Sequence, residues 1–210
     1  MARLSGQGQD VVPVHEPGGT DLGDSVRALL VRRGWSPVDP RAEALLFSAC
    51  RAQLVAEVIR PSLIRGAVVI ADRFADSTLA YQGAGRGLPM DGLQPLIEMA
   101  TNGLKPDLTL LLDVSSEVGL SRRAAEGSGT PTEQSSLFDA DVQMPLGWNR
   151  FEDEELDFHH RVRDAYLRLA GAEPERWRVI DASAPSSLVA EAVWRSVDAS
   201  LATRGAVHRA

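Results

Sequence analysis

Short apolar runs separated by amphipathic stretches dominate the hydrophobic pattern of the chain. The runs, which predict β-strands, cover residues 11–14, 67–71, 108–112 and 177–180. The run at 67–71 shows no polar alternation, which is typical of a strand buried on both faces of a parallel sheet. In the first run Pro13 lacks a ladder donor and favours an edge position. Strands that alternate with helices predict an α/β fold, with a parallel sheet flanked by helices and joined by right-handed crossovers.

Apolar residues at helical spacing predict helices between and after these strands. The helices are expected over residues 21–33, 40–60, 91–103, 117–126, 152–170 and 186–201. Thr20 and Asp39 are suitable N-caps, and Gly34 and Gly103 are suitable stops. The side chains expected to face the core include Leu22, Val26, Leu29, Leu30, Leu45, Leu46, Leu93, Met99, Phe158, Val162 and Ala165. Residues 1–9 are interpreted as a loop or a frayed helix end.

The composition indicates one globular domain spanning residues 1–210. Hydrophobic residues (44%) and charged residues (24%) are balanced as in chains that bury a sizeable core. A net charge of -7 argues against binding to a nucleic-acid backbone, but it is compatible with a small anionic ligand held by a few local arginines. The single cysteine, Cys50, excludes an internal disulfide and a metal site built from cysteines, and we expect it to be a buried thiol.

The chain carries no pattern that indicates a membrane protein. No segment has the roughly 18 uninterrupted apolar residues that a membrane span needs. The N-terminus also lacks the apolar core of a signal peptide. Together with the single reduced thiol, these features lead us to expect a cytoplasmic protein.

Residues 66–88, GAVVIADRFADSTLAYQGAGRGL, hold the strongest indication of function. Asp72 and Arg73 come directly after a predicted strand, and ligands of open α/β sheets bind beyond the carboxyl ends of the strands. Hydrogen-bonding side chains follow, and then a glycine-rich turn at 83–87. The alternative interpretation is an ordinary turn with a surface ion pair.

A second pair of residues suits a planar ligand. Phe47 and Arg51 are four positions apart on a predicted helix, so they project from it together. An aromatic ring can stack on a base while a guanidinium donates hydrogen bonds to the exocyclic oxygens of that base. The alternative interpretation is a core residue beside a surface residue.

The segment DRFADSTLAYQGAGRGL at residues 72–88 resembles bacterial thymidylate kinases. Four further motifs do so in the order of that family: HEPGGT at 15–20, LLFSACRAQL at 45–54, PDLTLLLDV at 106–114 and NRFE at 149–152. His15 stands where the family usually has arginine, and Asn149 stands where it has an acid. The resemblance implies the nucleoside monophosphate kinase type of P-loop fold. It also implies transfer of the γ-phosphoryl group of ATP to dTMP, with Mg²⁺, to give dTDP.

Candidate site residues are those that match the motifs of the family. The resemblance assigns dTMP binding to Glu16, Pro17, Phe47, Arg51, Arg73, Ser77, Thr78, Tyr81 and Gln82. It assigns catalysis to Asp72, Arg73, Arg122 and Arg150, and Mg²⁺ binding to Asp72 and Asp157. In this assignment Phe47 stacks on thymine, Arg51 reaches the edge of the base, and Arg73 binds the acceptor phosphate. Tyr81 would crowd the 2′ position against ribonucleotides.

A long polar stretch follows the fourth expected helix. Residues 127–148 are rich in glycine, serine, proline and acids, and they are too many for an ordinary connection. We interpret about 122–150 as a lid or insertion, because nucleotide kinases close lids that bring arginines onto the transferring phosphoryl group. Arg122 and Arg150 flank the stretch. A disordered loop with solvated arginines is the alternative.

Two acids elsewhere admit structural interpretations. Asp157 and Arg161 lie one helical turn apart, where the family has residues near the substrate phosphate and its metal. A salt-bridged helix surface explains this pair as well. Asp113, which ends the third strand, is expected to cap the helix that follows it.

The sequence contains no phosphate-cradling loop of the form G-x4-G-K-[ST]. Its one lysine, Lys105, precedes Pro106 and lacks the glycine frame of that motif. In the resembling family the phosphate loop follows a central strand. We therefore expect a gap in the sheet between the strands at 67–71 and 108–112, with unpaired backbone groups along buried edges.

Three hypotheses are compatible with a missing phosphate loop. The recorded start could lie too late within an active kinase, or the chain could be a non-catalytic protein that binds dTMP or a partner. It could also be a related deoxynucleotide kinase with another acceptor. We expect little or no kinase activity from the 210-residue chain alone. The resemblance further implies small nucleotide substrates as partners and suggests a homodimer.

Overall fold

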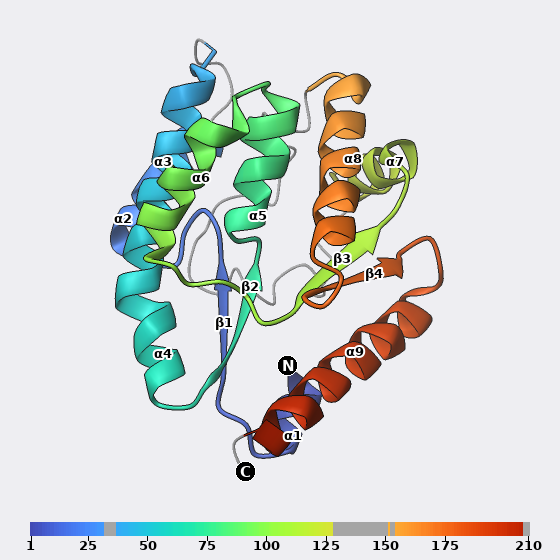
Figure 1. The fold of residues 1–210 in the computed structure, drawn as a ribbon. Coiled ribbons are helices and arrows are strands. Elements are labelled where there is room, and N and C mark those ends of the chain that lie inside the picture. Colours follow the sequence, from blue (N-terminus) through green and yellow to red (C-terminus); the bar gives the residue numbers. More distant parts are fainter. Residues whose placement is uncertain (32–36, 128–150, 152–153, 208–210) are drawn as a thin grey trace.

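The computed structural model describes residues 1–31, 37–127, 151 and 154–207 (Figure 1). The expected lid segment at 128–150, Arg150 included, lies outside the described residues. The strands are β1 (Val11–His15), β2 (Val68–Asp72), β3 (Thr109–Asp113) and β4 (Trp177–Asp181). The α-helices are α1 (Ala2–Gly6), α2 (Asp21–Val31), α3 (Pro40–Leu54), α4 (Arg60–Ile64), α5 (Ala75–Thr78), α6 (Met90–Thr101), α7 (Ser116–Gly127), α8 (Leu156–Ala172) and α9 (Ser186–Val207). The π-helices are η1 (Val55–Ile59) and η2 (Leu79–Gly85).

The strands form two parallel pairs. β1 pairs with β2 from Val11↔Val68 to His15↔Asp72, and β3 pairs with β4 from Thr109↔Trp177 to Asp113↔Asp181. In the part of the chain that the structure describes, no pairing joins β2 to β3, and Figure 1 shows the two pairs apart. The predicted gap in the sheet is therefore confirmed, and β1 is an edge strand as Pro13 predicts.

The strands that flank the gap are more exposed than predicted. Ala71 and Asp72 of β2 are exposed, and half of the Leu112 surface in β3 is accessible to solvent. Water can therefore reach these edges, which removes much of the cost of unpaired backbone groups. The expectation of buried edges is wrong.

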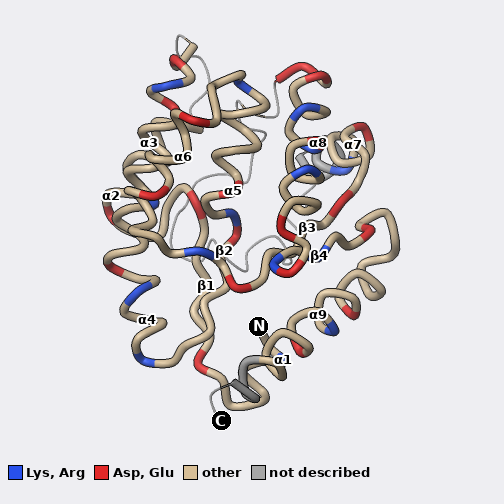
Figure 2. Tube along the Cα trace, in the orientation of Figure 1, with Lys and Arg blue, Asp and Glu red and all other residues tan. Residues whose placement is uncertain are grey.

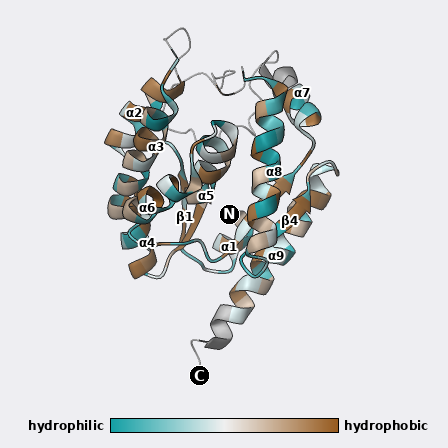
Figure 3. Cartoon of the chain, turned by 45° about the horizontal axis from the view of Figure 1, so that its top comes forward, coloured by the Kyte–Doolittle hydropathy of each residue, from teal (hydrophilic) through white to brown (hydrophobic). Residues whose placement is uncertain are grey.

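Helices cover both strand pairs (Figure 1). α3 packs against α2 and α6 beside β1 and β2, α8 packs against η2, β3 and β4, and α9 packs against β4. α8 carries hydrophilic and hydrophobic bands (Figure 3), and its predicted inward residues Phe158, Val162 and Ala165 are buried. The core next to β1 consists of Val14, Leu54, Val55, Ile59 and Phe74.

Several helices bury a narrower stripe than the apolar pattern predicts. Val26 and Leu30 of α2 pack on Cys50 of α3 as expected, and burial raises the pKa of the Cys50 thiol to about 11. Four residues expected to face the core are instead exposed: Leu22, Leu29, Leu45 and Met99. These apolar positions flank the buried stripe, so the helix contacts do not reach them.

The third helical segment runs further than predicted, and it contains a π-turn. α3, η1 and α4 continue without a break to Ile64, whereas the sequence predicts an end near residue 60. Pro61 has no backbone N–H, so the regular i to i−4 ladder cannot pass through this position. The π-turn of η1 precedes that proline and accommodates the change of hydrogen-bond register.

The glycine-rich stretch after β2 is helical up to Gly85, and the predicted turn at 83–87 is therefore wrong for its first part. A Cβ at Gly83 would lie 2.7 Å from Met90 Cε, and one at Gly85 would lie 2.6 Å from Phe158 Cε2. These glycines are needed for close packing. Gly87, with φ 78°, supplies the turn that follows.

A buried arginine joins three parts of the fold. Arg51 of α3 is 1% exposed and donates from Nε and Nη2 to Glu16 Oε2, at 2.9 and 2.6 Å. Nη1 donates to Thr78 Oγ1 at 3.0 Å, and Nη2 also donates to the Phe74 carbonyl at 3.3 Å. Glu16 follows β1 and Phe74 follows β2, so one guanidinium fixes α3 against both strand ends. Burial raises the pKa of Glu16, and Arg51 opposes this rise.

The buried pair predicts a large stability effect. Arg51→Met leaves the Glu16 carboxylate buried without its partner, so we expect the free energy of unfolding to fall by about 3–5 kcal/mol in urea denaturation. The matched control is Arg65→Met, whose ion pair with Asp10 is about half exposed. The control should lose about 0–1 kcal/mol. Similar losses in the two variants would contradict this account of the pair.

The close contact between η2 and α8 gives a second prediction. Gly85→Ala forces a methyl group against the buried side chains of Phe158 and Val162, and we expect a loss of about 1–3 kcal/mol in urea unfolding. Gly92→Ala in α6 is the control, because its Cβ would meet nothing within 4 Å. That variant should keep its stability or gain up to about 1 kcal/mol. If Gly85→Ala matches the wild type, α8 does not pack this tightly.

Candidate active site

The candidate site lies where β1 and β2 end. Glu16 follows β1, Asp72 is the last residue of β2, and Arg73 follows directly. Figure 2 shows charged residues where β2 runs into α5. Parallel strands deliver their carboxyl ends to one edge, and this edge is the usual ligand crevice of α/β sheets. The predicted concentration of charge at this edge is therefore present in the structure.

Arg73 has a backbone conformation that non-glycine residues seldom adopt. Its φ of 68° lies in the left-handed region, and such strain at the end of a strand is typical of functional sites. The residue is exposed, and its Cζ lies 4.7 Å from the centroid of the Tyr81 ring. Tyr81 raises the pKa of Arg73, so the guanidinium stays cationic. The turn thus holds a fixed positive charge beside the Tyr81 ring.

Three rings, which we call the aromatic wall, connect Phe47 to the Arg73 side of the site. Phe47 meets Phe151 edge to face at a centroid distance of 6.0 Å, and Phe151 meets Tyr81 in the same way at 6.2 Å. Since Arg73 lies over Tyr81, the guanidinium and the Phe47 ring belong to one continuous set of contacts. The structure therefore links, through ring contacts, the two groups to which the resemblance assigns the phosphate and the base.

The other predicted polar residues in α5 and η2 form hydrogen bonds with neighbouring helices. Thr78 and Gln82 are buried, and Gln82 Nε2 donates to Glu43 Oε1 at 2.7 Å. Ser77 and the hydroxyl of Tyr166 are 2.7 Å apart. Burial raises the pKa of Tyr166 to about 12. These hydrogen bonds fix η2 and α5 at the site.

Sequence reasoning missed Glu43, although a signal was available. Its side chain is fully buried, and it accepts hydrogen bonds from Gln82 and Arg86. Glu43, Phe47 and Arg51 follow one another at intervals of four, which places them on one face of α3. An acid in register with the two predicted ligand contacts would have been a reasonable candidate.

Arg51 retains a donor after making its core contacts. Nη1 carries a second N–H besides the one that can bond to Thr78. Among the residues that the structure describes, no hydrogen bond is seen from Nη1 to another acceptor. A planar ligand held on Phe47, one turn earlier on α3, would lie on the same face of the helix.

Residues around the turn after β1 have structural contacts. The Pro17 carbonyl accepts from Arg27 Nη1 at 2.9 Å and lies 3.2 Å from His15 Nδ1. Thr20 Oγ1 accepts from the Gly23 amide at 3.0 Å, which confirms the predicted N-cap. Glu16 is buried against Arg51. Contacts within the protein therefore fix the conformation of this turn.

The candidate residues Arg122 and Asp157 come from α7 and α8. Arg122 donates from Nη1 to the Ala182 carbonyl after β4, at 2.8 Å. Asp157 is exposed in the first turn of α8, and Arg161 of that helix donates to the Gly85 carbonyl at 3.0 Å. The Asp113 carboxylate accepts hydrogen bonds from Nε and Nη2 of Arg163, at 2.7 and 2.8 Å. The expected capping role of Asp113 is therefore wrong, because a helix across the strand end supplies a stronger partner.

The described residues contain no group of three or more His, Cys, Asp or Glu that could hold a metal ion. Mg²⁺ at phosphoryl-transfer sites usually keeps several waters and takes one or two carboxylates together with substrate phosphates. A single exposed carboxylate at the end of β2, Asp72, fits that coordination. Among the same residues, no helix is long and apolar enough to cross a membrane.

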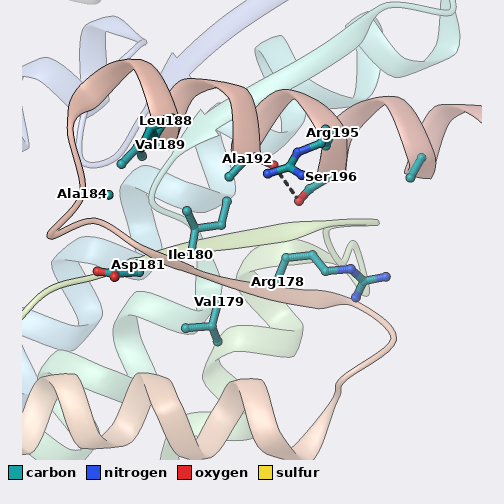
Figure 4. A pocket seen from close by; sticks show the side chains of 11 residues that line it. Arg178, Val179, Ile180, Asp181, Ala184, Leu188, Val189, Ala192, Arg195 and Ser196 are labelled. Carbon is teal, nitrogen blue, oxygen red and sulfur yellow. Dashed lines mark hydrogen bonds between the residues drawn. The ribbon is translucent and has the colours of Figure 1, made fainter.

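A cavity of ≈ 560 Å³ lies elsewhere, between β4 and α9 (Figure 4). Its lining includes Ile180, Leu188 and Arg195, and none of the predicted site residues. The candidate site is therefore defined by the strand ends and the aromatic wall and does not coincide with this cavity.

Comparisons with known proteins identify the family. Residues 1–193 match the Thymidylate kinase family. The thymidylate kinase of Thermomicrobium roseum is 47% identical over 196 residues, which cover 93% of this chain and 84% of that protein. The enzyme of Solidesulfovibrio magneticus is 46% identical, covering 92% of this chain and 87% of the relative.

A solved structure shows the same architecture. The crystal structure of thymidylate kinase from Ehrlichia chaffeensis superimposes with a TM-score of 0.64 at 29% sequence identity, and the match covers 90% of this chain and 80% of that one. The parallel strands flanked by helices agree with the nucleoside monophosphate kinase fold. The chain therefore belongs to the thymidylate kinase family.

Proposed function

We propose that this protein binds dTMP at the carboxyl edge of β1 and β2 and acts in the phosphorylation of dTMP to dTDP. The observation that carries the proposal is the continuous set of contacts from Arg73 over Tyr81 and Phe151 to Phe47. It provides a cation for a phosphate at one end and an aromatic face for a base at the other. Membership of the thymidylate kinase family supports the choice of acceptor.

Arg73 binds the acceptor phosphate in this proposal. A guanidinium fork matches two phosphate oxygens, and the strained turn holds it at the strand end without the help of a ligand. Asp72, its neighbour, orients the same phosphate or a water on Mg²⁺. Phosphoryl transfer depends mainly on positioning and charge neutralisation, so such fixed groups supply what the reaction requires.

Phe47 and Arg51 bind the base in this proposal. The Phe47 ring stacks on thymine, and the remaining Nη1 donor of Arg51 bonds to an exocyclic oxygen. Since Glu16 fixes the guanidinium, little side-chain entropy is lost when the ligand binds. Thr78 and Gln82 support this arrangement from the buried side, and Tyr81 and Ser77 line the sugar.

ATP would supply the γ-phosphoryl group and Mg²⁺ would neutralise charge on the nucleotide phosphates. Arg122 and Arg150 remain the candidates for lid charge, and Arg150 lies outside the described residues. For Asp157 the metal role stays a prediction, as do a homodimer and a cytoplasmic location.

Titration calorimetry tests the assignment of phosphate and base. Arg73→Met should weaken dTMP binding by about tenfold to hundredfold, because a charge-assisted contact is lost. It should leave thymidine, which has no phosphate, unaffected. Phe47→Ala should weaken both ligands by about fivefold to hundredfold. The exposed Arg65→Met serves as the control and should bind both ligands like the wild type.

Comparing the binding of different deoxynucleoside monophosphates tests which acceptor the protein selects. The wild-type chain should bind dTMP more tightly than dCMP, dGMP or dAMP. Equal and weak binding of all four monophosphates would refute the proposed acceptor. If Arg73→Met lowered the affinity for dTMP and for thymidine by the same factor, the phosphate role of Arg73 would be refuted.

A further inference from the structure

Arg86, at the end of η2, lies between two carboxylates that come from different parts of the chain. It donates to both oxygens of Glu43 at 3.3 Å and forms an ion pair with Glu154 at 2.6 Å. Burial lowers the pKa of Arg86, but the two carboxylates outweigh it and the net shift is upward. Arg86 is therefore a fixed cation that connects buried α3 to the residues just before α8.

The same guanidinium makes a cation–π contact with one ring of the aromatic wall. Its Cζ lies 5.7 Å from the centroid of Phe151 and 4.9 Å from that of Phe158. Phe151 is the middle ring of the wall, in contact with both Phe47 and Tyr81. Among the described residues the Arg86 guanidinium lies over neither of those outer rings. It reaches both of them through Phe151, and it also reaches Tyr81 through Phe158, whose ring centroid lies 6.0 Å from that of Tyr81.

The need to neutralise the buried Glu43 carboxylate does not explain why Arg86 also pairs with Glu154. Glu43 needs a counter-charge and a hydrogen-bond donor, and Arg86 and Gln82 supply both within the core. The ion pair with Glu154, whose side chain is 28% exposed, adds nothing to that requirement. It ties the guanidinium that lies over Phe151 to a side chain just before α8.

We propose that Arg86 is a positioning residue for the acceptor base: together with Glu154 it holds Phe151 against Phe47 and Tyr81, and so completes the aromatic wall. This inference rests on the proposed binding of dTMP. Phe151 is the group that acts, and the Arg86–Glu154 pair acts through it. No contact between described side chains joins the Arg86 guanidinium to that of Arg73, the proposed phosphate ligand.

The test uses Glu154→Gln, which removes the ion pair and leaves the buried Glu43–Arg86 contact in place. Glu155→Gln is the matched control, because Glu155 is exposed and its side chain forms no cap hydrogen bond with α8. Calorimetry on the full chain should show Glu154→Gln weakening dTMP and thymidine by the same factor, about twofold to tenfold. Glu155→Gln should bind both like the wild type.

A double-mutant cycle separates positioning from a general structural effect. Phe151→Ala should weaken both ligands, and Glu154→Gln should then cause no further loss in that background, because the pair acts through the ring. Equal effects of Glu154→Gln with and without Phe151 would overturn the proposal, as would tighter binding by Phe151→Ala. If the wild type binds dTMP and the Glu154→Gln and Glu155→Gln variants bind it with equal affinity, this inference alone is refuted. Absence of dTMP binding by the wild type would refute the proposed function, and this inference with it.

Discussion

The ion pair between Arg51 and Glu16 is the interaction on which the rest of the structure depends. Both side chains are almost fully buried, and the guanidinium also bonds to Thr78 and to the carbonyl of Phe74. A buried pair of this kind seldom adds much net stability, because desolvation offsets the attraction between the charges. Its consequence is geometric: α3 can lie against the ends of β1 and β2 in one position only, since any other position would leave a charge buried without a partner.

That constraint determines where the ligand-facing groups of α3 point. Glu43, Phe47 and Arg51 follow at intervals of four, so fixing Arg51 fixes the Phe47 ring one turn before it and the Glu43 carboxylate two turns before it. Glu43 in turn holds Gln82 and Arg86 of the segment after β2. Ion pairs within the protein thereby position the aromatic wall before a ligand binds. Such preorganisation reduces the entropy lost on binding.

Much of the fold and the position of the site could be predicted from the sequence. The four strands, the edge position of β1 and the charged turn at Asp72 and Arg73 follow from local patterns, whereas the gap beside β2 follows from the resemblance to thymidylate kinases. The burial of Arg51 could not be predicted, because its partner Glu16 is 35 residues away in the sequence. The π-helical course of Gly83 and Gly85 also depended on contacts with Met90 and Phe158 that no local pattern reveals. Asp113 was misassigned for the same reason, since Arg163 reaches it from a distant helix.

A crystal structure of the 210-residue chain with dTMP would test the central claim most directly. The account predicts that the phosphate lies within hydrogen-bond distance of the Arg73 guanidinium and that the thymine ring stacks on Phe47, with Arg51 still bonded to Glu16. A nucleotide bound in the cavity between β4 and α9, or a phosphate remote from Arg73, would contradict it.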